Sequence, residues 1–478
     1  MATHTHSARV LLSSQAARSE DCDCACETPH PAPLTFTQPV QWQQAKDVRV
    51  LHATLPQAWQ ALYHPSGPVA LAVLNPAAQN LWAQHASPRP LDVSNQSAWQ
   101  LAQAGFLQPH PESSAPSLPS TSRLTAWLHL TNACNLACPY CYLRKTSAHM
   151  RWETAQKAID KLTATAAQAH YPALKLKYAG GEPLLRFPFL QRLHAYARQQ
   201  AQAHGLRLES VVLSNGTLLT APMAEYLAAH HIALAVSLDG LGEHHDRQRP
   251  YPNGRGSFQK VIENLLLAQH LGVDVIANIT LTSWNLSGIP DLVRWLLQHD
   301  IPFSLNFYRD HALASEDLSL YNQQLIQTLQ AVYREVENNL PRWSLLGRLT
   351  DRASLATAHS RVCSAGHDYI VIDHEGRISP CQMLIGQRAV ADLHTDDILE
   401  AVRQPQPWFA NPTVEEKSTC ATCPWRYWCG GGCPLMTYRH TGRFDARSPF
   451  CEVYQTTIPE VLRLEALRLI KYASQPLQ

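Results

Sequence analysis

The sequence of 478 residues predicts an α/β protein: a partial (β/α)6 barrel, with a small α+β module before it and a cysteine-rich domain after it. Two observations predict this fold class. From about residue 124 to residue 307, six apolar strand-like runs alternate with amphipathic stretches, which favours a parallel sheet built by right-handed crossovers. From about residue 352, the chain is rich in cysteine and in loop-forming residues. Because active sites of such sheets lie at the C-terminal ends of the strands, chemical motifs should follow strands.

The alternating region supplies the elements of the barrel in order. The expected strands are residues 124–131, 174–179, 208–214, 232–238, 273–280 and 303–307. The expected helices are residues 153–169, 187–203, 221–230, 257–271 and 289–299. Beyond the barrel, residues 368–379 are typical of a hairpin that turns at Glu375 and Gly376, and a last helix is expected from Ile458 to about Tyr472.

Composition narrows the class of protein. A net charge of +1 gives no global basic field that would favour nucleic acid or a membrane surface as a partner. No apolar run reaches about 18 residues, so no membrane-spanning helix is expected, and the first residues lack a signal-peptide core, which predicts the cytoplasm. There, clustered cysteines more often bind metal than form disulfides. The alternative of scattered buried cysteines fits poorly, because ten of the 13 fall into spaced groups after residue 130.

The chain divides into segments by composition. Cys22, Cys24 and Cys26 lie near the N-terminus and either hold a metal or, as the favoured interpretation, belong to a disordered acidic tail. The module that follows contains a strand expected at 69–75 and helices expected at 76–82 and 97–107. The expected segments are a flexible tail (1–30), this module (31–108), a linker rich in proline and serine (109–122), the barrel (123–351) and the cysteine-rich domain (352–478).

Three cysteines follow the first expected strand of the barrel, at Cys134, Cys138 and Cys141. Three thiolates in a Cys-x3-Cys-x2-Cys spacing suit three corners of an iron–sulfur cube and leave the fourth iron without a protein ligand. An iron with an open position can bind a substrate or a cofactor. Further motifs follow the next three strands: Gly-Gly-Glu-Pro at 180–183, Ser-Asn-Gly-Thr at 214–217 and Ser-Leu-Asp-Gly at 237–240.

As a set, these motifs resemble the radical S-adenosylmethionine (SAM) superfamily. The resemblance covers roughly residues 124–310, and the segments 245–249 and 254–258 continue it in the family's order. It implies a radical SAM barrel in which Cys134, Cys138 and Cys141 hold a [4Fe-4S] cluster, with SAM bound to the fourth iron through its amino and carboxylate groups.

The resemblance also implies roles for single residues. Asp239 would face the substrate and is proposed as a base in some relatives, whereas the alternative is a turn residue that closes the fourth strand. The residues implied to contact SAM are Tyr140 near the adenine, Gly180, Gly181 and Glu182 at the methionine amine, and Ser214 and Arg249 at the methionine or ribose end, where Arg249 suits a carboxylate.

A second group of cysteines has the spacing Cys-x2-Cys-x5-Cys-x3-Cys-x17-Cys between residues 420 and 451. This spacing resembles the SPASM domain, which follows the radical SAM core in peptide-modifying enzymes. The resemblance implies two auxiliary [4Fe-4S] clusters. The implied ligands are Cys363, Cys381 and Cys433 for the first, and Cys420, Cys423, Cys429 and Cys451 for the second.

The sequence departs from one pattern of this domain. Some relatives carry a further cysteine between the first two of the set, and residues 364–380 contain none. The first auxiliary cluster would therefore have either an open iron, which suits a substrate thiolate, or a ligand such as His367 or Asp368. The alternative without iron is a pair of zinc ribbons, which explains neither the first triplet nor residues 180–183.

The N-terminal module resembles the PqqD-like peptide-recognition element in residues 69–79 and 101–107. That element is a winged-helix fold that binds a leader peptide as an added strand. The alternative is an accessory domain that only packs on the barrel.

Together the segments resemble a radical SAM/SPASM peptide maturase. Such an enzyme would use SAM and three [4Fe-4S] clusters to form a thioether or carbon–carbon crosslink in a precursor peptide. Its partners would be that peptide with its leader and an electron donor such as flavodoxin or ferredoxin. One alternative is a sulfatase maturase that generates formylglycine, and another is a non-catalytic iron–sulfur protein that senses redox state or carries electrons.

Overall fold

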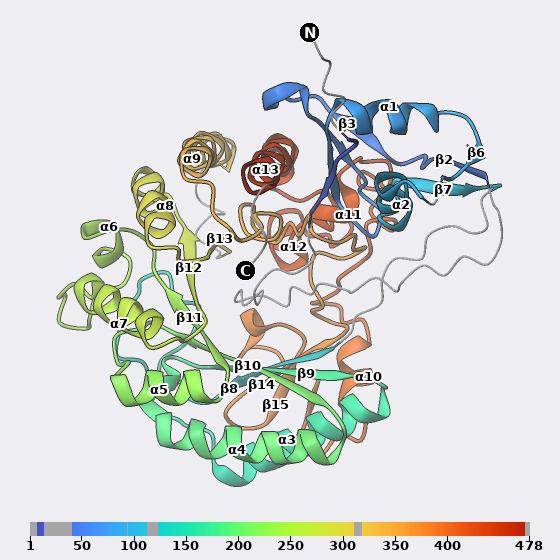
Figure 1. Cartoon of the computed structure of the whole chain (residues 1–478). Coiled ribbons are helices and arrows are strands. Elements are labelled where there is room, and N and C mark those ends of the chain that lie inside the picture. The colour runs from blue at the N-terminus through green and yellow to red at the C-terminus, as the bar shows by residue number, and fades with distance from the viewer. Residues whose placement is uncertain (1–6, 14–40, 93, 112–122, 310–317, 474–478) are drawn as a thin grey trace.

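A curved parallel sheet forms the centre of the molecule (Figure 1). The computed structural model describes residues 7–13, 41–92, 94–111, 123–309 and 318–473 of the chain. Six parallel strands lie side by side in the order β13-β12-β11-β10-β9-β8, as the alternating pattern predicts. Their bounds are β8 (Leu124–His129), β9 (Ala173–Ala179), β10 (Arg207–Ser214), β11 (Ile232–Ser237), β12 (Val275–Leu281) and β13 (Phe303–Phe307).

Helices follow the strands and cover the outer side of the sheet (Figure 1). Each helix is amphipathic; α3 buries Ala155, Ile159 and Leu162 on its apolar face, for example. Because every crossover brings the chain back to the same end of the sheet, the loops after the strands converge there. The helices are α3 (Trp152–Gln168), α4 (Phe187–Ala203), α5 (Ala221–Ala229), α7 (Phe258–His270) and α8 (Ile289–Gln298).

The C-terminal region extends the same sheet. The predicted hairpin is present as β14 (Tyr369–Ile372) and β15 (Arg377–Ser379), paired antiparallel, and Gly376 has a φ of 88° in its turn. β14 also pairs in parallel with β8, and β16 (Ala391–Asp392) pairs with β15. The expected boundary at residues 351/352 therefore does not separate two sheets, because hydrogen bonds between distant strands cross it.

Two long helices pack side by side above the barrel: α9 (Leu318–Asn338) and α13 (Cys451–Tyr472). Residues 318–338 were assigned no helix from the sequence. The last helix begins seven residues before its expected start. Pro459, a residue type that is typical of a first helical turn, lies inside α13 instead. Three short helices complete this region: α10 (Ile398–Arg403), α11 (Arg426–Cys429) and α12 (Pro434–Thr441).

The N-terminal module contains two small antiparallel sheets and two helices. β1 (Val10–Leu12) belongs to the first sheet, so these residues correct the expectation of a loose tail over 1–30. The helix expected at 97–107 ends at Gln103, because Gly105 takes a φ of 78° and β7 follows, reaching into the expected linker. The remaining elements are β2 (Gln41–Gln44), β3 (Arg49–Leu51), β4 (Gln60–Tyr63), β5 (Leu71–Leu74), β6 (Arg89–Pro90), β7 (Leu107–His110), α1 (Pro76–Gln84) and α2 (Gln96–Gln103).

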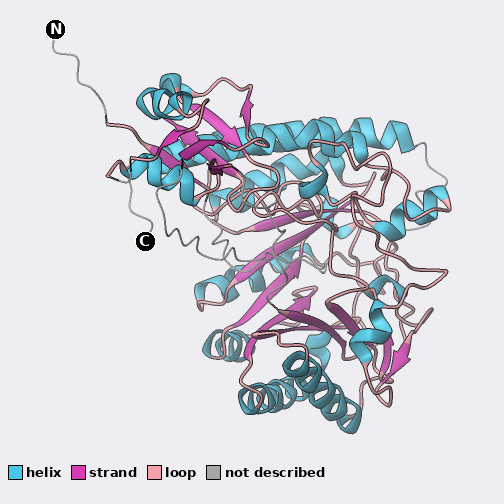
Figure 2. Ribbon diagram, turned by 90° about the vertical axis from the view of Figure 1, so that its right-hand side faces the viewer, coloured by secondary structure: helices cyan, strands magenta, loops and turns pink. Residues whose placement is uncertain are grey.

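This module packs on the C-terminal region, as both views show (Figures 1 and 2). Its first sheet, in the order β1-β5-β4-β3, contacts α13. The ring of Tyr63 stacks on Trp425 with 5.4 Å between ring centroids and lies 5.9 Å from Trp428.

Among the described helices, none has the length and apolar character needed to cross a membrane. Cys22, Cys24 and Cys26 lie outside the described residues.

Candidate active site

A cavity of about 200 Å³ opens at the C-terminal ends of the barrel strands. Eight of the residues predicted from the sequence for the cluster and SAM line it: Cys134, Cys138, Cys141, Tyr140, Gly180, Gly181, Ser214 and Arg249. Glu182 and Asp239 do not line it. The cavity is also lined by residues to which the sequence analysis gives no role: Arg309, Arg352, Gln382 and Met383.

The three-cysteine loop follows β8 and is tied to neighbouring segments by backbone atoms. The Ala137 N–H donates to the Pro250 carbonyl over 2.7 Å, and Lys145 Nζ donates to the Leu136 carbonyl over 2.6 Å. Cys134, Cys138 and Cys141 are free thiols. Burial raises the pKa of Cys134 to about 11, so this thiol is held neutral unless a cation binds it.

The donor set fits an iron–sulfur cluster. Three soft sulfur ligands face one cavity, and each would bind a different iron of a cube. In the part of the chain that the structure describes, no group of three or more histidine, cysteine, aspartate or glutamate side chains is spaced to hold a single metal ion.

Gly180 and Gly181 bring β9 against the start of the cysteine loop. A Cβ atom on Gly180 would lie 2.5 Å from the carbonyl oxygen of Thr131, and one on Gly181 would lie 2.3 Å from that of Ala133. The Gly181 N–H donates to the Thr131 carbonyl over 2.7 Å. Only glycine allows this approach, so the pair positions the backbone just before Cys134 as well as lining the cavity.

Glu182 is fully buried beneath the cavity. Its carboxylate accepts hydrogen bonds from Ser214 Oγ (2.8 Å), the Asn215 N–H (2.7 Å) and the Leu184 N–H (3.0 Å). Burial raises the pKa of Glu182 to about 7, against the opposite effect of these hydrogen bonds. Glu182 thus fixes the loop after β10, and from that loop Asn215 Nδ2 lies 3.8 Å from Cys134 Sγ. Its expected contact with the methionine amine stays a prediction.

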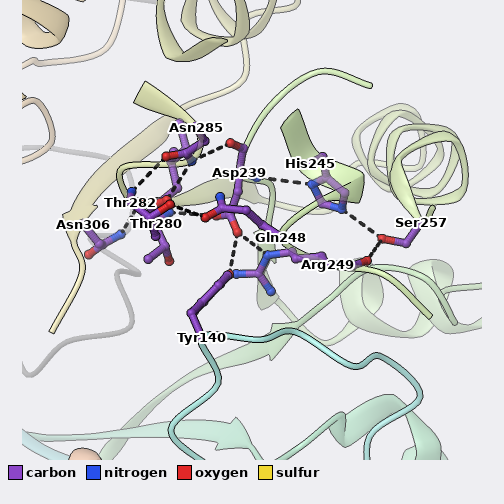
Figure 3. A network of polar contacts seen from close by, with 11 residues as sticks. Tyr140, Asp239, His245, Gln248, Arg249, Ser257, Thr280, Thr282, Asn285 and Asn306 are labelled. Carbon is purple, nitrogen blue, oxygen red and sulfur yellow. Dashed lines mark hydrogen bonds and ion pairs between the residues drawn. The ribbon is translucent and has the colours of Figure 1, made fainter. Parts of the chain in front are cut away.

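Asp239 is the centre of a buried polar network (Figure 3). Its Oδ2 accepts from Arg249 Nε over 2.6 Å and from the Tyr140 hydroxyl over 2.5 Å, and its Oδ1 accepts from the Thr280 N–H over 2.8 Å. Asn285 Nδ2 donates to the backbone carbonyl of Asp239 over 2.7 Å. Asp239 is completely buried, and both carboxylate oxygens already accept hydrogen bonds. Asp239 therefore holds Tyr140 and Arg249 in place, and its expected role as a substrate-facing base stays a prediction.

Ser257 and His245 hold the backbone of Arg249 (Figure 3). Ser257 Oγ donates to the Arg249 carbonyl over 2.6 Å and lies 3.1 Å from His245 Nε2. Burial lowers the pKa of His245 to about 4, so it is a neutral partner in this chain of contacts. The segment 245–249, which the sequence assigned only by resemblance, thus has a physical role in fixing the backbone of Arg249, whereas Asp239 binds its guanidinium group.

Cys363, Cys381 and Cys433 belong to one apolar cluster beside the cavity. Burial first, and then the nearby thiols of Cys433 and Cys363, raise the pKa of Cys381 to about 12. Asp368, one candidate for a fourth ligand, is engaged elsewhere. Its Oδ1 accepts from Arg403 Nη2 over 2.7 Å and also bonds to the Tyr171 hydroxyl.

The other four cysteines line a separate cavity of about 110 Å³: Cys420, Cys423, Cys429 and Cys451. The structure therefore places the seven cysteines of the C-terminal region in two groups, and these are the groups that the resemblance implies. Gly430, Gly431 and Gly432 connect the groups with φ values of 54°, 75° and 71°. A Cβ on Gly430 would lie 2.2 Å from the Val362 backbone nitrogen, so this bridge requires glycine.

Several residues near these cysteine groups have no role in the predictions from the sequence. Asn215 lies inside the quoted 214–217 motif but received no role. Arg309, paired with buried Asp351, and Arg352, which has a φ of 53°, are separated from the motifs along the chain. Buried Lys417 donates to the Gly431 carbonyl over 3.0 Å. Short-range patterns do not reveal such residues, because only the fold brings them to the cysteines.

Comparisons with known proteins identify similar sequences and a similar fold. Residues 128–296 match the model of the Radical SAM superfamily. An uncharacterized protein of Methanocaldococcus jannaschii is 30% identical over 171 residues, which cover 36% of this chain and 57% of that protein. The serine-type anaerobic sulfatase-maturating enzyme of Bacteroides thetaiotaomicron is 24% identical over 347 residues, covering 64% of this chain and 81% of that enzyme.

The solved structure of native anSMEcpe with bound AdoMet (S-adenosylmethionine) has a similar fold. It gives a TM-score of 0.58 at 18% identity and covers 73% of this chain and 99% of that one. The chain thus contains a radical SAM domain in a mixed α/β fold with a central sheet. The family match and the maturase relatives support an enzyme that uses SAM radical chemistry.

Proposed function

We propose that this protein is a radical SAM/SPASM peptide maturase that forms an intramolecular crosslink in a ribosomally made precursor peptide. One observation carries the proposal. A single cavity is lined both by the Cys134 loop and by Gln382 and Met383, which directly follow Cys381 of the first auxiliary group. A peptide side chain in this cavity would lie between the SAM site and that group.

In this proposal, SAM bound with its cluster supplies a 5′-deoxyadenosyl radical after one-electron reductive cleavage, and a reductant of the flavodoxin or ferredoxin class supplies the electron. The chain's own residues bind and orient. Arg249, held by Asp239, would bind the SAM carboxylate, and Tyr140, fixed by the same carboxylate, would pack near the adenine. The apolar wall, including Leu213 and Phe307, would exclude water from the reacting carbon.

The auxiliary clusters are part of the proposal. Cys363, Cys381 and Cys433 would hold the first, and the four cysteines of the 110 Å³ cavity would hold the second. Loss of two hydrogens from the peptide would form one bond. The deoxyadenosyl radical would take one of them as a hydrogen atom, and the other would leave as a proton and one electron, which the auxiliary clusters would accept. An open iron in the first cluster would favour a thioether from a substrate cysteine. The alternative product of the proposed reaction is a carbon–carbon crosslink.

The N-terminal module would bind the leader of the precursor peptide. Its four-stranded sheet ends in the edge strands β1 and β3, and an edge strand can accept an added strand through backbone hydrogen bonds. The stacking of Tyr63 on Trp425 would keep the bound leader beside the C-terminal region. Fluorescence anisotropy of a labelled leader from a neighbouring short reading frame, titrated with the full chain, tests this role.

A second candidate is formylglycine formation, which is favoured by the sulfatase-maturating relatives and the anSMEcpe fold. The two products differ in chemistry: formylglycine is an aldehyde and reacts with a hydrazide, whereas a crosslink does not. Mass spectrometry of the co-expressed peptide, before and after hydrazide treatment, separates them.

The primary test is SAM cleavage by the anaerobically reconstituted full chain with dithionite. We expect 5′-deoxyadenosine from the wild-type protein and none from Cys134→Ala. Cys429→Ala should keep part of the cleavage but lose peptide modification. A wild-type chain that carries clusters and does not cleave SAM would refute the enzyme proposal, and identical behaviour of the two variants would refute the division of roles between cysteine groups.

A further inference from the structure

The first auxiliary cysteine group has a buried phenol beside it that no other role explains. Tyr369 begins β14, has no exposed surface and packs in the same apolar cluster as Cys363, Cys381 and Cys433. Its backbone lies opposite Thr125 of β8 in the sheet register. The fold therefore fixes this side chain on the face of the sheet that carries the three thiols.

The Tyr369 hydroxyl has no hydrogen-bond partner among the described residues. A buried polar group without a partner is costly, so such a group in a native protein calls for an acceptor. Trp127 Nε1, on the neighbouring strand and in the same cluster, is a second buried donor without a partner among the described residues. Two unpaired donors beside three thiols point to an acceptor that is itself anionic.

The other polar residues near this position face elsewhere. Asp368 lies in the turn before β14, and its carboxylate binds Arg403 and Tyr171. His367, in the same turn, lies among Arg361, Asp368 and Arg403. The two fourth-ligand candidates taken from the sequence thus have charged neighbours of their own, whereas Tyr369 packs in the cluster of the thiols.

We propose that the Tyr369 phenol donates a hydrogen bond to the first auxiliary iron–sulfur cluster, which Cys363, Cys381 and Cys433 would hold, and thereby raises its reduction potential. This inference rests on the proposed function, because it requires that Cys363, Cys381 and Cys433 hold a cluster. A phenol is an O–H donor at neutral pH, and cluster sulfides and thiolates are acceptors. Hydrogen bonds to these sulfurs favour the more negative, reduced state and so raise the potential.

The test is a potentiometric titration, followed by electron paramagnetic resonance, of the reconstituted full chain and of Tyr369→Phe. The signal of the first auxiliary cluster is assigned by its loss in Cys381→Ala. Loss of one hydrogen bond to a charged group should lower the reduced-to-oxidised ratio at a fixed potential roughly tenfold, which is about 59 mV for a one-electron couple. Iron content and SAM cleavage should stay at the wild-type level.

A matched control is Tyr333→Phe. Tyr333 is equally buried, but its hydroxyl donates to the Leu349 carbonyl over 3.1 Å, away from both cysteine groups. This variant should leave the potential unchanged. In the cluster-free proteins, thermal unfolding should show Tyr333→Phe destabilised and Tyr369→Phe as stable as wild type or more so, because only Tyr333 loses a bonded hydroxyl.

Two results would overturn the inference. An unchanged reduction potential in Tyr369→Phe would show that the hydrogen bond is not formed. Loss of iron from that variant would show that Tyr369 is a ligand of the cluster instead of a hydrogen-bond donor. The proposed function would fail in a different way: the wild-type chain would then reconstitute with iron for one cluster only, before any variant is compared.

Discussion

Replacing Asp239 by asparagine separates a positioning role from a catalytic one. The substitution keeps the shape of the side chain but removes the charge that faces Arg249 Nε over 2.6 Å and the Tyr140 hydroxyl over 2.5 Å. Asp239 is 0% exposed and Arg249 is 11% exposed, so the remaining guanidinium has little access to water.

The expected cost follows from this burial. Removing one partner of a buried ion pair costs roughly 3–5 kcal/mol, because the other charge is left uncompensated. Asparagine still offers one acceptor oxygen to Arg249, so we expect the lower end, about 3 kcal/mol. With a urea m-value of about 3 kcal/mol/M, the unfolding midpoint should fall by about 1 M. SAM affinity, measured by calorimetry, should weaken roughly tenfold because Arg249 is no longer fixed.

Asp246→Asn is the matched control. Asp246 lies on the same segment, and its Oδ1 accepts from the Phe258 N–H over 2.7 Å. It forms no ion pair with the described residues, so an amide oxygen can replace it. This variant should unfold near the wild-type midpoint. If Asp239→Asn also unfolded there and bound SAM normally, the positioning argument would be wrong. Loss of peptide modification alone, with stability and SAM affinity intact, would identify Asp239 as a base.

Three further predictions test other parts of the site. Burial raises the pKa of Glu182 from 4.5 to about 7, so its contribution to folding is fully present below about pH 4.5 and is lost as pH rises through 7. Glu182→Gln should therefore reduce the fall in the free energy of unfolding between pH 5 and pH 8 by on the order of 3 kcal/mol, measured by urea titration at each pH. Gly181→Ala should lower both the melting temperature and the iron bound per chain, because its Cβ would lie 2.3 Å from the Ala133 carbonyl just before the cysteine loop. Tyr63→Ala should lower the free energy of unfolding by about 3 kcal/mol, because the stacking on Trp425 is lost. In limited proteolysis, the N-terminal module should then be cleaved faster, while the fragment that contains the radical SAM domain persists.

The sequence predicted the barrel well because its signals are local. Each strand of the barrel is a short apolar run, and each motif directly follows one, so order along the chain already places the loops at one end of the sheet. The two cysteine groups that the fold brings together are those implied by the resemblance to the SPASM domain, because spacing alone does not separate them.

The sequence could not predict what depends on distant pairing. β14 joins β8 across more than two hundred residues, and β1 joins β5 from within a segment that was expected to be loose. The direction in which a side chain points was equally hidden. Asp239 and Glu182 sit in motifs that imply contact with ligands, yet in the structure both carboxylates turn into the protein and hold neighbouring loops.

The charge balance of the C-terminal region connects its two cysteine groups. Lys417 is almost fully buried, and its ammonium is bound to the Gly431 carbonyl in the glycine bridge between the groups. Burial lowers the pKa of Lys417, whereas Cys420, Cys429, Cys433 and Cys363 act in the opposite direction. A buried cation is costly without nearby negative charge, and neutral thiols supply none. Thiolates that hold iron would supply it from both sides at once, so the position of Lys417 is explained most simply if both groups carry clusters.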